Sequence, residues 1–379
     1  MTLAQQQFLE LLRSGLWGTP AETELFKDNV DWNAILRIAM QQAVQVVVAD
    51  GIETLPKEMW PPKEAVYKLM MVRIKTEQMH GFLSSPLNQI VNALNAEKIP
   101  SVLLKGQGVA QNYRKPTSRM CGDIDLYTGL GGYEQTCKII EKLQGDRPHK
   151  EGEECDHHMH LSLNGVEVEV HRYADMMPSQ KLNKSLQKWN QESIDAHFGT
   201  DTLRKWDNNG TDIHLATPTF DAFFILHHAV RHMTTEGVGF RQICDWAMYL
   251  HNNHHLIDTD ELSKRLKEFH METIWKEFGI LAVTALGLPK EELPLAPSEL
   301  HPNRKTSELL RHIFISGNFG RYDENGRDYR STTYIKRKWR SFRFQSMRLI
   351  KLFKLFPKYA SNYMWHWLTD ALVRLNKGE

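Results

Sequence analysis

The sequence predicts an α+β protein in which a small mixed β-sheet lies between an N-terminal and a C-terminal helical region. Two observations support this fold class. Apolar residues recur every three to four positions over residues 1–95 and again beyond residue 178, as in amphipathic helices. Between them, short β-rich segments lie within residues 99–175. We therefore expect an α+β core with helical additions on both sides.

Four regions are expected along the chain. They are a helical region, a sheet-containing core, a second helical region and a basic amphipathic helical tail, at residues 1–95, 96–200, 201–330 and 331–379. A chain of 379 residues, with 41% hydrophobic and 25% charged residues, is long enough for two or three domains and a sizeable core. Its formal net charge of +1 argues against a protein that coats nucleic acid through overall charge.

The compartment is indicated by the cysteines and by the absence of targeting signals. The four cysteines are widely spaced and form no CxxC pair, which argues against a disulfide scaffold or a zinc ribbon and favours a reducing environment. The first residues have helical spacing without a basic start, and no apolar run reaches the roughly 18 residues of a transmembrane helix. We expect a cytoplasmic protein, at most peripheral at a membrane.

The N-terminal region contains apolar residues at helical spacing from Phe8 onward. Asp31 precedes the pattern Trp32–Ala39 and is expected to cap that helix. Pro61-Pro62 is expected to open a longer helix, because proline is tolerated where the first amides have no helical partner. Pro86 is expected to break or kink this longer helix, because it lacks an amide hydrogen.

The central region contains three segments with strand character. They read IPSVLLKG, GDIDLYTG and NGVEVEVHRY and begin at residues 99, 122 and 164. The third begins with an Asn-Gly turn signal. Helical spacing occurs between the second and third segments at Tyr133–Leu143, and later at Pro218–Met233, Gln242–His251 and Leu262–Leu286.

The strongest chemical signal is a pair of aspartates within one expected strand. Residues two apart on a strand point to the same side, so Asp123 and Asp125 would project together while Ile124 and Leu126 enter the core. Two adjacent carboxylates repel each other unless a cation lies between them, and Mg²⁺ prefers such oxygen ligands. A solvated strand edge is the alternative interpretation of this pattern.

A second expected strand carries further carboxylates. The valines of Val166–Val170 share one face, and Glu167, Glu169 and His171 share the other, so a third carboxylate can join the aspartate pair across the sheet. The same alternation is typical of any half-exposed strand.

A glycine turn precedes the aspartates. Lys105 and Gly106 lie where an expected strand leads into a helix, and free amides at such a turn, together with the helix dipole, attract phosphate. Arg119, shortly before the aspartates, can add a bidentate phosphate contact.

Together these residues resemble the uncharacterised nucleotidyltransferase family of the polymerase-beta-like superfamily. The resemblance rests on KGQGVAQNYRKPTSRMCGDIDLY, on Glu169-Val170-His171, and on LHHAVRHMTTEGVGFRQICDWAMYL with His228 and His232. It spans roughly residues 31–286, and its specificity lies in the combination of the motifs rather than in any one of them.

The resemblance implies a fold and an activity. The fold is a small mixed sheet forming a nucleotidyltransferase core, and the activity is metal-dependent transfer of a nucleoside monophosphate from a triphosphate such as ATP to an acceptor, releasing pyrophosphate. By this analogy Asp123, Asp125 and Glu169 are the catalytic residues that hold Mg²⁺ or Mn²⁺. The nucleotide-binding residues are Lys105, Gly106, Arg119, His171, His228 and His232.

The glycine turn departs from the wider superfamily, in which Gly-Ser or Gly-Gly is usual. Gln107 follows Gly106, so a serine hydroxyl contact to phosphate is missing. The sequence is compatible with a site that turns over and with one that only binds nucleotide, and ordinary helix packing is an equal alternative for His228 and His232.

A run of cysteine and histidines over residues 155–160 invites a zinc hypothesis. Strand alternation would put Cys155 and His157 on one side, and His158 and His160 on the other, which divides the set. A strand near the active site with exposed imidazoles is the favoured interpretation.

The tail is locally very basic. From Ser331 to Thr369 there are nine Lys or Arg and no Asp or Glu. An amphipathic helix is expected there, with an apolar stripe that includes Trp339, Phe342, Ile350, Phe353 and Phe356. This helix can pack on the helical region, lie on an anionic membrane surface or bind nucleic acid.

Two classes of function remain. The first is the nucleotidyltransferase, whose acceptor can be a small molecule, a sugar phosphate, a protein or RNA. The second is a non-catalytic nucleotide-binding or membrane-surface-associated module that retains the fold, with the tail at 331–369 as its peripheral membrane or nucleic-acid contact.

Overall fold

The fold is taken from a computed structural model, which describes residues 1–28, 30–145, 153–154, 158–177, 179–320 and 334–364. The described chain is mostly helical with two small sheets, compatible with the α+β class. Its contacts group it into two compact units. The first comprises Met1–Pro61, Met177–Leu182 and Ala222–Glu379, and the second comprises Pro62–Met176 and Asn183–Asp221.

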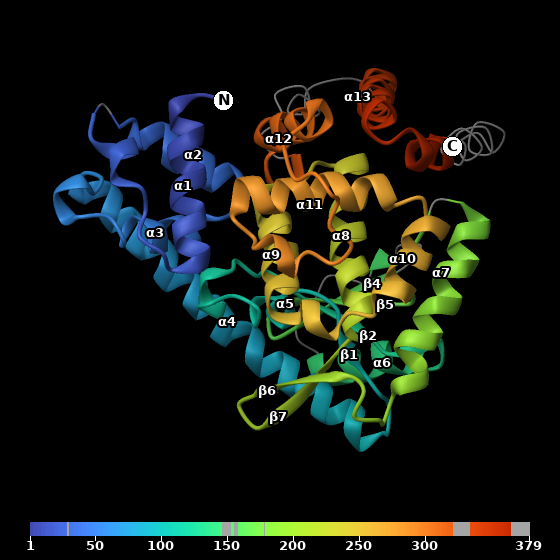
Figure 1. The fold of residues 1–379 in the computed structure, drawn as a ribbon. Helices are drawn as coiled ribbons and strands as arrows, with labels where there is room; N and C mark the ends of the chain where they lie inside the picture. The colour runs from blue at the N-terminus through green and yellow to red at the C-terminus, as the bar shows by residue number, and fades with distance from the viewer. Residues whose placement is uncertain (29, 146–152, 155–157, 178, 321–333, 365–379) are drawn as a thin grey trace. The chain divides into compact units, whose positions relative to one another are not determined.

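The second unit contains both sheets (Figure 1). The larger sheet has the strand order β1-β2-β5-β4-β3, in which β2 and β5 are parallel and the other pairs antiparallel. Its strands are β1 (Val102–Leu103), β2 (Asp123–Tyr127), β3 (Glu153–Glu154), β4 (His158–Leu163) and β5 (Val166–His171). A separate antiparallel hairpin consists of β6 (Arg204–Asn208) and β7 (Thr211–Leu215). All three expected strand segments are confirmed.

The turn between β4 and β5 has two residues with positive φ. Asn164 has φ 55° and Gly165 has φ 83°, as a type I′ turn requires at both positions. The Asn-Gly signal in the sequence is therefore confirmed as a tight hairpin. Because the turn sets the register, Leu161 faces Val168 and His160 faces Glu169 across the two strands.

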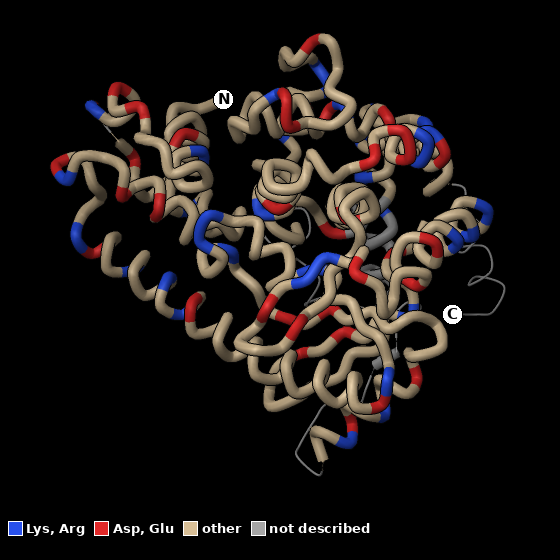
Figure 2. The backbone as a smooth tube through the Cα atoms, turned by 60° about the horizontal axis from the view of Figure 1, so that its bottom comes forward, with Lys and Arg blue, Asp and Glu red and all other residues tan. Residues whose placement is uncertain are grey.

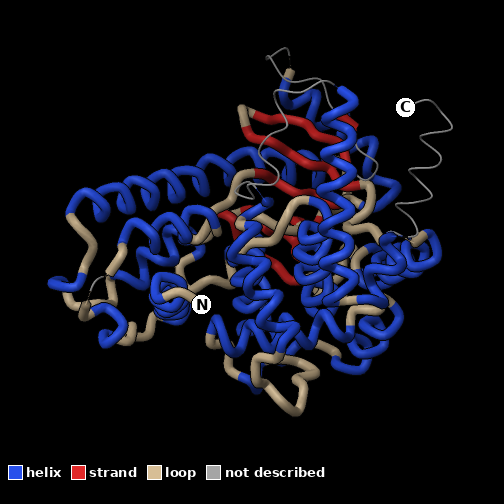
Figure 3. Tube along the Cα trace, turned by 90° about the horizontal axis from the view of Figure 1, so that it is seen from above, coloured by secondary structure: helices blue, strands red, loops and turns tan. Residues whose placement is uncertain are grey.

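Helices α4 (Lys63–Ala96) and α6 (Gly129–Gln144) pack against one face of the larger sheet, and Figure 3 shows helices beside the strands. The second unit also contains α5 (Gln107–Ala110) and most of α7 (Gln180–Ser193). The core combines apolar side chains of α4 and α6 with the inward residues of β2 and β5. These inward residues are Ile124, Leu126, Val166, Val168 and Val170. The opposite face of the same strands is left for polar side chains.

Helix α4 runs unbroken through Pro86 (Figure 1), so the expected break is wrong. Proline at this position removes one helical hydrogen bond. Its neighbours Leu83 and Leu87 are fully buried in the core beside the sheet, and Pro86 is itself buried. This burial holds the helix together across the missing bond. As expected, Pro61-Pro62 directly precedes the helix.

The first unit is helical. Its elements are α1 (Leu3–Trp17), α2 (Trp32–Gln41), α3 (Gln45–Ile52), α8 (Pro218–Thr235, from Ala222 onward), α9 (Phe240–Asn253), α10 (Thr259–Glu268), α11 (Glu272–Leu286), α12 (Arg304–Ser316) and α13 (Tyr334–Leu355). Asp31 caps α2 as expected, because its Oδ1 accepts from the backbone N–H of Ala34 at 2.9 Å. Gly15 of α1 lies directly against the backbone of α3 at Val47.

The tail forms a helix whose apolar face differs from the expected one. Leu349, Leu352 and Leu355 are buried, and Tyr359 just beyond the helix donates to or accepts from His227 Nε2 at 3.1 Å. Ile350 and Phe353 are exposed, so the expected stripe is wrong at these two positions, although Phe356 is buried as expected. Buried positions recur every three to four residues, as on an amphipathic helix, but Leu349 and Leu352 are buried in place of the predicted Ile350 and Phe353. The segments 331–333 and 365–369 lie outside the described residues.

Among the described residues, no helix is long and apolar enough to cross a membrane.

Candidate active site

Strand β2 supplies two carboxylates on the face opposite the core. Asp125 is almost fully buried, whereas Asp123 at the start of the strand is half-buried. The alternation of the strand explains the arrangement, since Ile124 and Leu126 enter the core from the other face. The expected division of this strand into a core face and a polar face is confirmed.

Strand β5 brings further carboxylates beside them. The parallel register pairs Asp125 with Glu169 and Asp123 with Glu167. Paired residues of neighbouring strands point to the same face of a sheet, so four carboxylates line two adjacent strands. Figure 2 marks the Asp and Glu positions along the backbone in red. The arrangement concentrates negative charge at one surface of the sheet.

His171 lies between two of these carboxylates. Its Nε2 is 3.1 Å from Asp125 Oδ1 and 3.4 Å from Glu169 Oε2, and its side chain is almost completely buried. An imidazole N–H placed here donates to the carboxylates and reduces their repulsion. The sequence assigned His171 to nucleotide binding; the structure places it within the carboxylate cluster, in contact with two candidate metal ligands.

Lys105 supplies positive charge to the same cluster. Its Nζ lies 2.8 Å from Asp125 Oδ1. Burial opposes ionisation of both groups, but their mutual attraction outweighs it, with help from Glu169 and Asp123 on the lysine and from His171 on the aspartate. The pKa of Lys105 is therefore raised and the pKa of Asp125 is far below its usual value. Both side chains are charged at neutral pH.

The turn that presents Lys105 depends on glycine. Gly106 has φ 58° and ψ −124°, which side chains other than glycine disfavour. A Cβ at this position would also lie 3.2 Å from the backbone oxygen of Asp123. The following helix α5 has only four residues, so a helix dipole contributes less to phosphate attraction than the sequence suggested.

Gln107 directly follows the glycine turn. Its Nε2 donates to the backbone oxygen of His80 at 3.1 Å and to Ser84 Oγ at 3.0 Å. Both partners belong to α4. The glutamine therefore anchors the turn to the long helix, which is a structural reason for its presence there.

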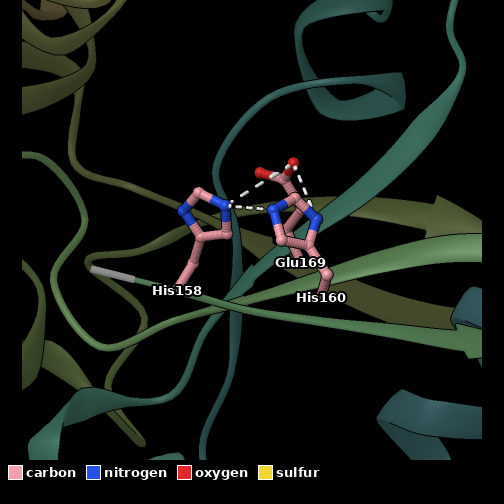
Figure 4. A group of neighbouring side chains, drawn as sticks. All are labelled: His158, His160 and Glu169. Carbon is pink, nitrogen blue, oxygen red and sulfur yellow. Dashed lines mark hydrogen bonds and ion pairs between the residues drawn. The ribbon is translucent and has the colours of Figure 1, made fainter. Parts of the chain in front are cut away.

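Two histidines of β4 flank Glu169 (Figure 4). The Nε2 atoms of His158 and His160 are 2.8 Å apart, and Glu169 Oε1 lies 3.9 Å from His158 Nε2 and 3.6 Å from His160 Nδ1. Burial, which outweighs the attraction of Glu169, lowers the pKa of His158 to about 4. Burial raises the pKa of Glu169, but His171 and Lys105 outweigh it, so the net pKa is lowered.

In the sequence these two histidines belong to the zinc hypothesis, for which a strand with exposed imidazoles is the favoured interpretation; in the structure His158 is buried and His160 is partly buried. Strand alternation did place His158 and His160 on one side, and this is confirmed by their contact. The other members of the zinc hypothesis, Cys155 and His157, lie outside the described residues. Spacing within one strand does not show that Glu169 faces His160 across the β4–β5 hairpin, and this contact adds the third candidate ligand.

Arg119 lies in a separate local network. It is buried, and its Nη1 donates to Cys121 Sγ at 3.1 Å, while its backbone oxygen is 2.8 Å from His80 Nε2. Burial would raise the pKa of Cys121, but the charges and hydrogen bonds of Arg119 and His80 lower it. A phosphate contact from Arg119 stays a prediction.

His228 and His232 lie on α8 in the first unit, whereas the carboxylates belong to the second. Their Nε2 atoms are 2.9 Å apart, and His232 Nδ1 lies 3.3 Å from Glu236. The two histidines share a helix face, as their spacing predicts. Their assignment to nucleotide binding stays a prediction.

Two overlapping groups of side chains have the composition and spacing to hold a metal ion within the described residues. One is Asp125, Glu169 and His171, and the other is His158, His160 and Glu169, with ligand atoms within 4.8 Å of one another in each group. The first adjoins Asp123 and is rich in carboxylate oxygen, which suits Mg²⁺ or Mn²⁺.

Comparison with known proteins gives one match. A family model described as an uncharacterised nucleotidyltransferase matches residues 28–287, more than half of the chain and inclusive of every residue of the carboxylate cluster. No curated protein and no solved structure matches the chain.

Proposed function

The chain belongs to the uncharacterised nucleotidyltransferase family, and from this premise we propose that it transfers a nucleoside monophosphate from a nucleoside triphosphate to an acceptor with release of pyrophosphate. The reaction depends on Mg²⁺ or Mn²⁺ held by Asp123, Asp125 and Glu169. The acceptor classes remain a small molecule, a sugar phosphate, a protein or RNA.

The parallel pairing of β2 with β5 carries this proposal. It aligns Asp125 with Glu169 on the polar face of the sheet, one strand spacing apart, with Asp123 two residues before Asp125 on the same face. Three carboxylates that share one face repel one another, and a divalent cation relieves that repulsion. Their hard oxygen donors fit Mg²⁺ or Mn²⁺.

The protein groups around the cation have distinct roles in this proposal. Asp125 is ionised because its pKa is far below the usual value, so it acts as a ligand and not as a proton donor. His171 holds the carboxylates of Asp125 and Glu169 in place through its Nε2. Glu169 is less buried than Asp125 and is positioned to receive the proton of the acceptor hydroxyl.

Lys105 binds the phosphates in this scheme. With a cation held by Asp125, the Lys105 ammonium would no longer be needed to neutralise that carboxylate and would be available to a phosphate oxygen beside the Gly106 turn. The metal, when bound, supplies charge neutralisation for the phosphates and polarises the acceptor oxygen. Positioning and electrostatic stabilisation account for most of the catalysis that phosphoryl-type transfer needs from a protein.

Pyrophosphate release by the full-length protein tests the proposal. Each of the four ribonucleoside triphosphates is supplied with Mg²⁺ or Mn²⁺, and the intact mass of the protein is followed to detect self-modification. We expect metal-dependent release that falls at least about 100-fold in Asp125→Asn, because one ligand of the metal is lost. Asp212→Asn is the matched control, since Asp212 is an exposed aspartate of β7.

Two outcomes contradict the proposal. Metal-dependent nucleotide binding without pyrophosphate release, with every triphosphate and each acceptor class, identifies a binding module instead. Release that persists in Asp125→Asn shows that the carboxylate cluster is not the site.

A further inference from the structure

We propose that His158, His160 and Glu169 form a second metal site, which binds a borderline transition ion such as Zn²⁺ and rejects Mg²⁺. The site shares Glu169 with the carboxylate cluster assigned to Mg²⁺ or Mn²⁺ above. The proposal of a second site rests on the proposed function only through Glu169. It can be tested separately, because metal binding is measured without nucleotide.

The first support is geometric. Two ligand atoms at 2.0–2.1 Å from a tetrahedral ion lie about 3.3 Å apart. The separations are 2.8 Å between the two histidine Nε2 atoms and 3.9 Å between His158 Nε2 and Glu169 Oε1, which lie on either side of the ideal spacing. Glu169 Oε1 also lies 3.6 Å from His160 Nδ1, and the three side chains offer ligand atoms within 4.8 Å of one another, so side-chain rotations would bring the ligands around one ion.

The second support is the neighbour of His160. Its Nδ1 lies 3.0 Å from Glu167 Oε1, while its Nε2 points to His158 (Figure 4). A histidine that binds metal usually donates its other ring N–H to a carboxylate, which fixes the tautomer and the ring orientation. Glu167 provides such a carboxylate, and its position on β5 follows from the hairpin register.

The third support is the type of donor. Two imidazoles and one carboxylate are a ligand set that Zn²⁺ uses in open sites, with a water in the fourth position. The imidazole of His160 is 30% exposed, so solvent reaches this side of the group. Mg²⁺ prefers oxygen ligands in octahedral geometry and is disfavoured by two nitrogen ligands. The two sites are therefore distinguished by their metals even though they share Glu169.

The test is the binding of Co²⁺ and Zn²⁺ to the full-length protein after treatment with a chelator. Co²⁺ replaces Zn²⁺ in such sites and reports the coordination number through its visible absorption. For the wild type we expect one Co²⁺ with the spectrum of a four- or five-coordinate ion, displaced by Zn²⁺ and not by excess Mg²⁺. Asp123→Asn keeps this spectrum even though it removes a ligand of the other site.

Variants assign the ligands. His160→Gln and His158→Gln are expected to lose the four- or five-coordinate spectrum, and Glu167→Gln to weaken metal affinity about 10–100-fold, as is typical for the partner of a metal-bound histidine. His255→Gln, an exposed histidine of the first unit, is the matched control and keeps wild-type binding. Circular dichroism with chelator shows that each variant is folded, and His160, the more exposed of the pair, is the safer position to change.

The proposal is overturned when the wild type binds no Co²⁺ or Zn²⁺, or when folded His160→Gln binds them as tightly as the wild type. It is also overturned when Mg²⁺ displaces Co²⁺ as readily as Zn²⁺ does. Failure of pyrophosphate release together with intact Co²⁺ binding rejects the proposed function and leaves the second site standing.

Discussion

Lys105→Met removes the positive partner of Asp125 and keeps a side chain of similar length. The Asp125 side chain is 2% exposed, so its carboxylate cannot recover hydration when the ammonium at 2.8 Å is lost. Removing one partner of a buried ion pair typically costs 3–5 kcal/mol. Because His171 still contacts the same carboxylate oxygen, we expect about 3 kcal/mol, the low end of that range.

The measurement is the free energy of unfolding in urea with a chelator present, followed by circular dichroism. Lys138→Met, at an exposed lysine of α6, is the matched control and is expected to change stability by less than about 0.5 kcal/mol. In the Asp125→Asn background, Lys105→Met is expected to cost less than about 1 kcal/mol, because the buried negative charge at residue 125 is gone. A loss of stability below about 1 kcal/mol in the wild-type background would refute the reasoning, and so would an equal loss in both backgrounds.

Three further predictions concern stability. Gly15→Ala is expected to lower stability by about 1–3 kcal/mol in thermal unfolding, because a Cβ there meets the backbone of α3. Gly81→Ala, in open space on α4, is the control and should be neutral or stabilising. Equal effects of the two substitutions would contradict the prediction. Asp31→Ala should cost about 1 kcal/mol in the same assay through loss of the α2 cap, and a shift no larger than that of exposed Asp28→Ala would count against the cap. The pKa of His158 is about 4 in the folded protein, so between about pH 7 and 4 the unfolded chain binds a proton that the folded chain does not. The free energy of unfolding of the metal-free protein should therefore fall as the pH decreases from about 7 to 4. The same dependence of stability on pH in His158→Gln would exclude this cause.

Local features of the fold were predictable from the sequence. The Asp31 cap and the Asn164-Gly165 turn depend on a few adjacent residues, and both are confirmed. The two faces of β2 and β5 follow from alternation alone. The break expected at Pro86 is wrong because the penalty of a proline is local, whereas the burial of Leu83 and Leu87 that offsets it comes from tertiary packing.

The candidate site was predictable in composition but not in arrangement. Alternation showed that Glu169 shares a face with Glu167 and His171, but the pairing of Asp125 with Glu169 is a contact between strands more than 40 residues apart. For the same reason, the approach of His160 to Glu169 depends on the hairpin register and not on spacing within one strand. The contact of Lys105 with Asp125 needed the turn geometry at Gly106 as well.

The hairpin turn between β4 and β5 has a consequence for how the molecule tolerates insertions. Along β5, odd-numbered positions carry the acids and the histidine, and even-numbered positions carry the valines of the core. A single added residue at Asn164-Gly165 would reverse this parity relative to β4, whereas two added residues would preserve it. A shift of one residue in the register would therefore bury the acidic side chains and expose the valines at the same time. An insertion of this kind would damage the candidate site and the core together.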